Sequence, residues 1–176
     1  KVLERLDRMI KKYGIIRLFR KGLDVDDAHF TLLYPSPLAS SSQSIRDNFE
    51  SNQFSSTRQI RYSLTNTKEE IDMVLFVNGL PFATMELKNA LTGQYLSQAI
   101  DQYKNDRDSR EKLFEFQRCL VHFAVSTESV AMTTQLKDKQ TYFLPFNEHL
   151  VNHNPNGFAT AFLWEEVLTK DSLLDL

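Results

Sequence analysis

Residues 72–88 decide the fold, and they read DMVLFVNGLPFATMELK. Two apolar stretches, 73–77 and 82–88, have the composition of β-strands. The Asn78-Gly79 pair between them supplies the positive φ angles that a tight reversal needs. The stretch therefore predicts a β-hairpin at the centre of the domain.

Three charged side chains stand at the open end of this hairpin in the pattern D-x13-E-x-K. Asp72 begins the first strand, and Glu86 and Lys88 end the second. Because side chains alternate along a strand, Glu86 and Lys88 are expected on one face, with Met85 and Leu87 facing the core. Two carboxylates and an amine can then converge on one point.

The pairing of the two strands decides whether Asp72 joins this group. A two-residue Asn78-Gly79 loop pairs residues whose numbers sum to 157, which sets Asp72 opposite Met85 and turns it away from Glu86. A three-residue loop or a β-bulge changes the sum to 158 and sets Asp72 opposite Glu86. A shared site therefore requires the shifted register or an irregular start to the first strand.

These residue types suit metal-assisted hydrolysis of a phosphodiester. Asp72, Glu86 and the Leu87 carbonyl offer the hard oxygen ligands that Mg²⁺ prefers. Lys88 can orient a water molecule and stabilise charge on a phosphate. The pattern also fits a surface hairpin whose Glu86–Lys88 ion pair contributes about 0 to 1 kcal/mol. Spacing alone leaves both interpretations open.

The composition is that of one soluble domain. The chain has 176 residues, of which 41% are hydrophobic and 25% charged, and its net charge is −2. This charge excludes a bulk positive field, and no apolar stretch approaches the roughly 20 residues that span a bilayer. The five glycines are too far apart for a phosphate-binding loop. A lone Cys119 and an N-terminus without a signal-peptide core favour a cytoplasmic protein.

The remaining patterns predict an α/β domain in which a mixed central sheet is flanked by helices. Apolar residues at helical spacing predict helices over residues 1–13, 95–105 and 159–168. Strand patterns cover residues 29–34, 57–63, 119–126, 130–134 and 141–146, the last two as a second hairpin. Residues 38–44, which follow two prolines and are rich in serine, predict a flexible loop.

Several segments resemble the type I restriction endonuclease R subunit. The two longest run from Ile71 to Pro81 and from Met85 to Asn89. Shorter similar segments are LTGQ at 91–94, QY at 102–103, HFAV at 122–125, FLPFN at 143–147 and FLWEE at 162–166. The resemblance covers roughly residues 57–176.

The resemblance implies a restriction-endonuclease-like core, a PD-(D/E)xK nuclease. It assigns catalysis to Asp72, Glu86 and Lys88, and metal binding to Asp72, Glu86 and Leu87, with Mg²⁺ or Mn²⁺ as cofactor. Residues 1–176 are then expected to form one nuclease domain, a fragment whose ATP-dependent motor follows and alone binds ATP. Three leucines within residues 171–176 agree with a missing neighbour, because a free terminus rarely exposes them. The implied partners are double-stranded DNA and the modification and specificity subunits.

Two further sets of residues follow from the resemblance and from their position near the site. The family carries a glutamine and tyrosine motif on the helix after the lysine, and its candidates are Gln98, Gln102 and Tyr103. Basic side chains beyond that helix are candidates for DNA-phosphate contacts: Lys104, Arg107, Arg110 and Lys112. A structural explanation fits both sets equally well: Gln98 can be solvated and Tyr103 can belong to the core, and the basic side chains can be a solvated helix end.

Two alternatives to the restriction nuclease stay open at this point. The same fold can serve as a catalytically silent docking module of a DNA translocase. It can also serve as a stand-alone resolvase or repair nuclease. The intact acidic and lysine residues argue against silence, and the apolar chain end argues against independence.

Overall fold

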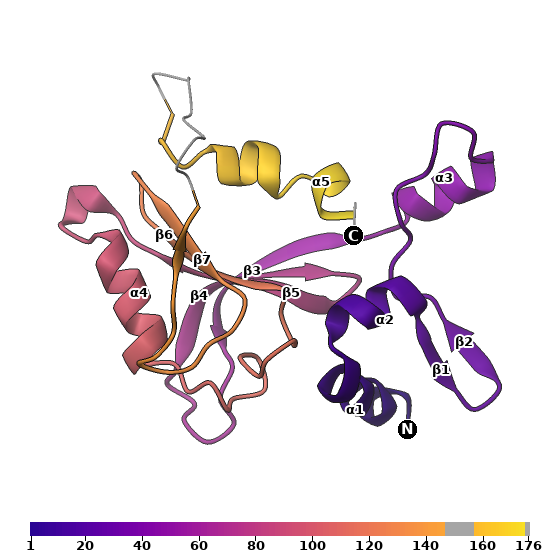
Figure 1. Ribbon diagram of the computed structural model, residues 1–176, viewed down its shortest axis with the longest axis horizontal. Coiled ribbons are helices and arrows are strands. Elements are labelled where there is room, and N and C mark those ends of the chain that lie inside the picture. Colours follow the sequence, from indigo (N-terminus) through magenta and orange to yellow (C-terminus); the bar gives the residue numbers. More distant parts are fainter. Residues whose placement is uncertain (147–156, 175–176) are drawn as a thin grey trace.

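The computed structural model describes residues 1–146 and 157–174. In this part of the chain six strands form one mixed sheet in the order β3-β4-β5-β6-β7-β8 (Figure 1). The strands are β3 Phe54–Arg61, β4 Glu70–Val77, β5 Leu80–Leu87, β6 Val121–Val125, β7 Val130–Thr133 and β8 Leu144–Pro145. β5 and β6 run parallel, and the other neighbouring pairs run antiparallel.

Helical segments cover both faces of this sheet. On one face, α4 (Leu96–Asn105) buries Ala99 and Tyr103 against the sheet. On the other face, η2 (Leu163–Val167) and α5 (Lys170–Leu174) close a second apolar cluster. The arrangement confirms the predicted α/β class with a mixed sheet between helices, and it is consistent with a restriction-endonuclease-like core.

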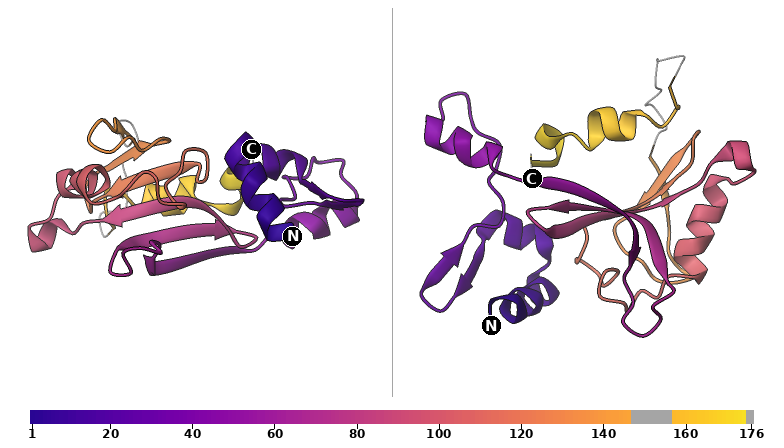
Figure 2. Two further views of the ribbon diagram at one scale, coloured as in Figure 1. Left: turned by 90° about the horizontal axis from the view of Figure 1, so that it is seen from below. Right: turned by 180° about the vertical axis from the view of Figure 1, so that it is seen from behind.

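The N-terminal segment lies at one end of the molecule, with α4 at the opposite end (Figure 2). It comprises α1 Val2–Tyr13, α2 Ile15–Lys21, the paired strands β1 Leu23–Val25 and β2 Ala28–Phe30, and α3 Gln43–Glu50. The predicted first helix is confirmed. Gly14 ends it with φ 80°, a backbone conformation that favours glycine, and its N–H donates to the Ile10 carbonyl.

The central hairpin contains both the predicted tight turn and the shifted register. Asn78 and Gly79 adopt positive φ angles of 49° and 78°. Next to the turn the paired residue numbers sum to 157, as in Val77–Leu80; farther out they sum to 158, as in Leu75–Ala83 and Met73–Met85. A bulge at Phe82 separates the two registers, because Phe82 is the extra residue on β5. Continued by one residue, the outer register sets Asp72 opposite Glu86.

Most predicted elements are present, with shifted ends. The strand expected at residues 29–34 reaches only Phe30 and belongs to the small β1-β2 sheet. The loop expected at 38–44 was wrong at its end, because α3 starts at Gln43. Of the helix expected at 159–168, residues 163–167 form a single π-helical turn.

One expectation about the core was half right. Met85 is buried in the apolar cluster under η2, as predicted. Leu87 was expected beside it but is 37% exposed. Leu87 is exposed because it is the last residue of β5, beyond the part of the strand that the other elements bury.

Candidate active site

Asp72 reaches across from β4 to the end of β5. Its Oδ2 atom accepts a hydrogen bond of 2.8 Å from the Leu87 N–H. The same oxygen lies 3.9 Å from the Lys88 ammonium. The Asp72 side chain is 38% exposed, so its carboxylate is anchored by β5 and still reachable from solvent.

The strand on the other side of Asp72 is distorted at the same level. Gln59 lies between Arg58, which pairs with Met73, and Ile60, which pairs with Ile71, so it stands opposite Asp72. Gln59 has φ 54°, a left-handed conformation that costs a non-glycine residue on the order of 1 kcal/mol or more. The strained residue of β3 therefore lies next to the residue of β4 that carries the carboxylate.

Glu86 is completely buried, which is unusual for a carboxylate. Its Oε1 accepts a 2.6 Å hydrogen bond from the Arg107 Nε. Its Oε2 has no hydrogen-bond partner among the described residues. Burial raises the pKa of Glu86 to about 7, and the negative charge of the neighbouring Asp72 adds to the rise. The positive charge and the hydrogen bond of Arg107 act in the opposite direction but do not cancel it. The effect of Asp72 on this pKa agrees with the register, which brings the two carboxylates together.

Lys88 directs its amine at the same place. Its side chain is only 10% exposed, and its backbone N–H donates to the Val125 carbonyl across the β5-β6 pair. The backbone is therefore held by the neighbouring strand while the ammonium approaches Asp72. Asp72, Glu86 and Lys88 thus meet at one end of the β4-β5 pair.

The oxygens present fit a hard divalent cation. Glu86 Oε2 is buried and has no hydrogen-bond partner among the described residues, Asp72 is partly exposed, and Leu87 follows Glu86 at the end of β5. In the described residues no group of three or more His, Cys, Asp and Glu side chains could hold a metal ion. Two carboxylates and a backbone carbonyl are therefore the donor set to consider, and such oxygen sets suit Mg²⁺ with several of its waters retained.

The three candidates of the helix motif have different roles. Gln98 caps α4, because its Oε1 accepts from the Tyr95 N–H at 2.7 Å. Tyr103 is core: its hydroxyl bonds to the Thr84 hydroxyl at 2.8 Å, and burial raises its pKa well above the usual value. Gln102 keeps a buried Oε1 without a hydrogen-bond partner in the described residues.

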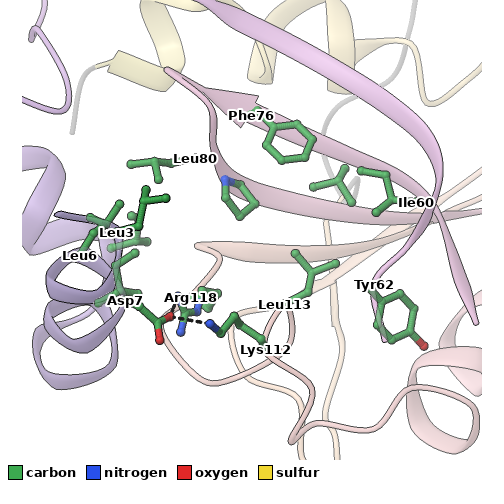
Figure 3. A pocket seen from close by; sticks show the side chains of 14 residues that line it. Leu3, Leu6, Asp7, Ile60, Tyr62, Phe76, Leu80, Lys112, Leu113 and Arg118 are labelled. Carbon is green, nitrogen blue, oxygen red and sulfur yellow. Dashed lines mark ion pairs between the residues drawn. The ribbon is translucent and has the colours of Figure 1, made fainter. Parts of the chain in front are cut away.

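Three of the four candidate phosphate contacts are paired with acids. Arg107 is bound to Glu86, and Arg110 binds Asp108 at 2.7 Å. Lys112 lies 3.1 Å from Asp7 of α1. Figure 3 shows this pair at the edge of a hollow of about 390 Å³ lined mainly by apolar side chains of α1 and the sheet.

Lys104 has a different setting, an open polar basin of about 760 Å³ beside the end of α4. Lys137 and Lys139 line the same basin, and so does Arg107, which bonds Glu86. Sequence reasoning missed both lysines because they lie more than thirty residues from Lys104. The basin is of mixed charge, because four acidic residues also line it: Glu69, Asp106, Asp108 and Asp138.

Comparison with known protein families shows which family the chain belongs to. The family described as type I restriction enzyme R protein N terminus matches residues 39–141, more than half of the chain. The chain belongs to this family. The match includes Asp72, Glu86 and Lys88 as well as Arg107. Among curated proteins none matches the chain. Within residues 1–146 and 157–174, no helix is long and apolar enough to cross a membrane.

Proposed function

We propose that this member of the type I restriction enzyme R family is a Mg²⁺-dependent DNA endonuclease domain of the PD-(D/E)xK kind. The observation that carries the proposal is the bulge in the central hairpin. The register beyond the bulge, continued by one residue, puts Asp72 opposite Glu86, and the Asp72 carboxylate lies 3.9 Å from the Lys88 ammonium. An Asn78-Gly79 hairpin without the bulge would turn Asp72 away from both. A surface hairpin with an incidental ion pair has no need of this register.

The chemistry proposed is hydrolysis of a phosphodiester by water. Asp72, Glu86 and the Leu87 carbonyl would hold Mg²⁺ or Mn²⁺, which when bound supplies positive charge to the phosphate and acidifies a bound water. Lys88 would orient the attacking water and stabilise the negative charge that develops on the phosphate. A P–O bond of the backbone breaks, and the leaving oxygen takes up a proton.

The proposed partners follow from the family. Double-stranded DNA is the substrate, and the modification and specificity subunits complete a cytoplasmic restriction complex. ATP would act in the motor region of the subunit. The net charge of −2 supports this division, because this chain has no bulk positive field with which to hold DNA by itself.

Three substitutions in the assembled enzyme test the proposal. Asp72→Asn, Glu86→Gln and Lys88→Ala should each abolish cleavage of plasmid DNA while ATP hydrolysis persists. Asp101→Asn, which changes an exposed carboxylate of α4, is the control and should cleave normally. Cleavage that survives all three substitutions would mean that the domain is a silent docking module. Loss of cleavage and ATP hydrolysis together, with a changed circular dichroism spectrum, would indicate a folding defect.

A further inference from the structure

Arg107 occupies a position that the proposed hydrolysis does not yet use. It follows α4 by two residues, and its side chain is 8% exposed beside the fully buried Glu86. The guanidinium Nε donates to Glu86 Oε1 at 2.6 Å, whereas Oε2 of the same carboxylate stays unpartnered. An arginine fork can bind both oxygens of a carboxylate, so engagement of a single oxygen leaves the other available.

The guanidinium also lies near an aromatic side chain. Its central carbon lies 5.9 Å from the centre of the Tyr62 ring. The Tyr62 ring packs edge-on against Phe114, with ring centres 4.7 Å apart. The Tyr62 hydroxyl donates to Glu69 Oε2 at 2.8 Å. Arg107 therefore lies near an aromatic ring that is itself fixed, and it bonds the buried carboxylate.

We propose that Arg107 is a positioning residue for the metal site: its single hydrogen bond to Oε1 holds the Glu86 carboxylate so that Oε2 is presented to a divalent cation. The inference rests on the proposed nuclease function. Without Arg107 the buried carboxylate loses the donor that holds Oε1, and nothing then fixes the rotation of the carboxylate. Outer partners of ligating carboxylates commonly affect metal affinity by about 10- to 100-fold.

The opposite role for Arg107 predicts the opposite result. A guanidinium that takes the place of the metal would compete with it, and its removal would tighten metal binding. The single-oxygen contact favours positioning, because Arg107 bonds Oε1 and leaves Oε2 of the same carboxylate available to a cation.

The test measures Mn²⁺ binding to the protein by isothermal titration calorimetry, with the metal alone as probe. Arg107→Ala should weaken binding by about 10- to 100-fold. Arg107→Lys keeps a cation but loses the directed Nε donor, so it should fall between Arg107→Ala and the wild type. Arg20→Ala is the matched control: it removes an exposed arginine of α2 that has no part in the candidate site, and this variant should bind Mn²⁺ as the wild type does.

A second readout comes from the assembled enzyme. The Mn²⁺ concentration for half-maximal cleavage should rise in Arg107→Lys, while the rate at saturating Mn²⁺ returns close to that of the wild type. A residue needed only for folding would lower the saturated rate as well. Thermal unfolding confirms that each variant is folded, and Arg107→Lys serves if Arg107→Ala is not.

Failure of this inference differs from failure of the proposed function. Wild-type Mn²⁺ binding that is lost in Asp72→Asn but unchanged or tighter in folded Arg107 variants overturns the role of Arg107 alone. Wild-type protein that binds no Mn²⁺, or binding that Asp72→Asn leaves intact, overturns the nuclease site and the role of Arg107 with it.

Discussion

Replacing Glu86 by glutamine should change how the stability of the domain depends on pH. Burial raises the pKa of Glu86 from its ordinary 4.5 to about 7, although Arg107 opposes the rise. A carboxyl group with a higher pKa in the folded state stabilises the fold while it is protonated. That contribution is fully present below about pH 4.5 and is lost as the pH rises through about 7. The Glu86→Gln variant has no such proton to lose.

The size of the effect follows from the two pKa values. They differ by about 2.5, and each pKa unit corresponds to about 1.4 kcal/mol, so the contribution is about 3 kcal/mol. The side-chain oxygen of a glutamine can still accept from Arg107, and any change in that hydrogen bond is independent of pH. We therefore expect Glu86→Gln to gain about 3 kcal/mol relative to the wild type between about pH 4.5 and pH 8.

Urea unfolding measures this difference directly. The single tryptophan, Trp164, reports the transition by fluorescence, and the wild type and Glu86→Gln are compared at several pH values. Taking the difference cancels the contributions of the other titrating groups. A difference in unfolding free energy that stays constant across this range would refute the reasoning, because Glu86 would then be as hydrated as a surface carboxyl.

Three other predictions concern the core and DNA binding. Burial lowers the pKa of His122 to about 4, so the contribution of the neutral imidazole to stability is present above about pH 6.5 and is lost as the pH falls toward 4. In urea unfolding, the free energy that His122→Gln loses between these pH values should be about 3 kcal/mol smaller than the free energy that the wild type loses. An equal loss in both proteins would contradict the burial of His122. In the same assay Met85→Ala should lower the unfolding free energy by about 2 to 5 kcal/mol, and Leu87→Ala should lower it by about 1 kcal/mol or less. Equal losses would contradict the difference in burial between Met85 and Leu87. The isolated chain should bind duplex DNA weakly, with a shallow slope of log affinity against log salt of about −0.9 per phosphate contact by anisotropy. Tight binding at physiological salt, or base preference, would place recognition in this domain.

The sequence predicted the central hairpin well because its signals are local. Asn78-Gly79 specifies the turn, and the alternating pattern around it specifies the strands. The sequence also defined which register a shared site requires. It could not say that the shift occurs, because the bulge lies at Phe82, whose buried ring packs in a cluster with residues from distant parts of the chain.

Elements held by tertiary contacts were beyond such reasoning. Helix α3 starts within a serine-rich stretch of low helical preference, but it is stabilised by buried Phe49 and by the Glu50–Lys170 ion pair. Arg107 was a candidate phosphate contact because it follows a helix near the site. Its actual partner, Glu86, lies 21 residues earlier, and no pattern in the irregular segment after α4 indicates that pairing.

The proposed nuclease site is tested most directly by locating a metal ion in it. Crystals of the domain soaked with Mn²⁺ can be examined by anomalous diffraction at the Mn²⁺ concentration that supports cleavage by the assembled enzyme. The account predicts an anomalous peak bounded by Asp72, Glu86 and the Leu87 carbonyl. A site that stays empty at this concentration, or a peak only at other carboxylates, would contradict it.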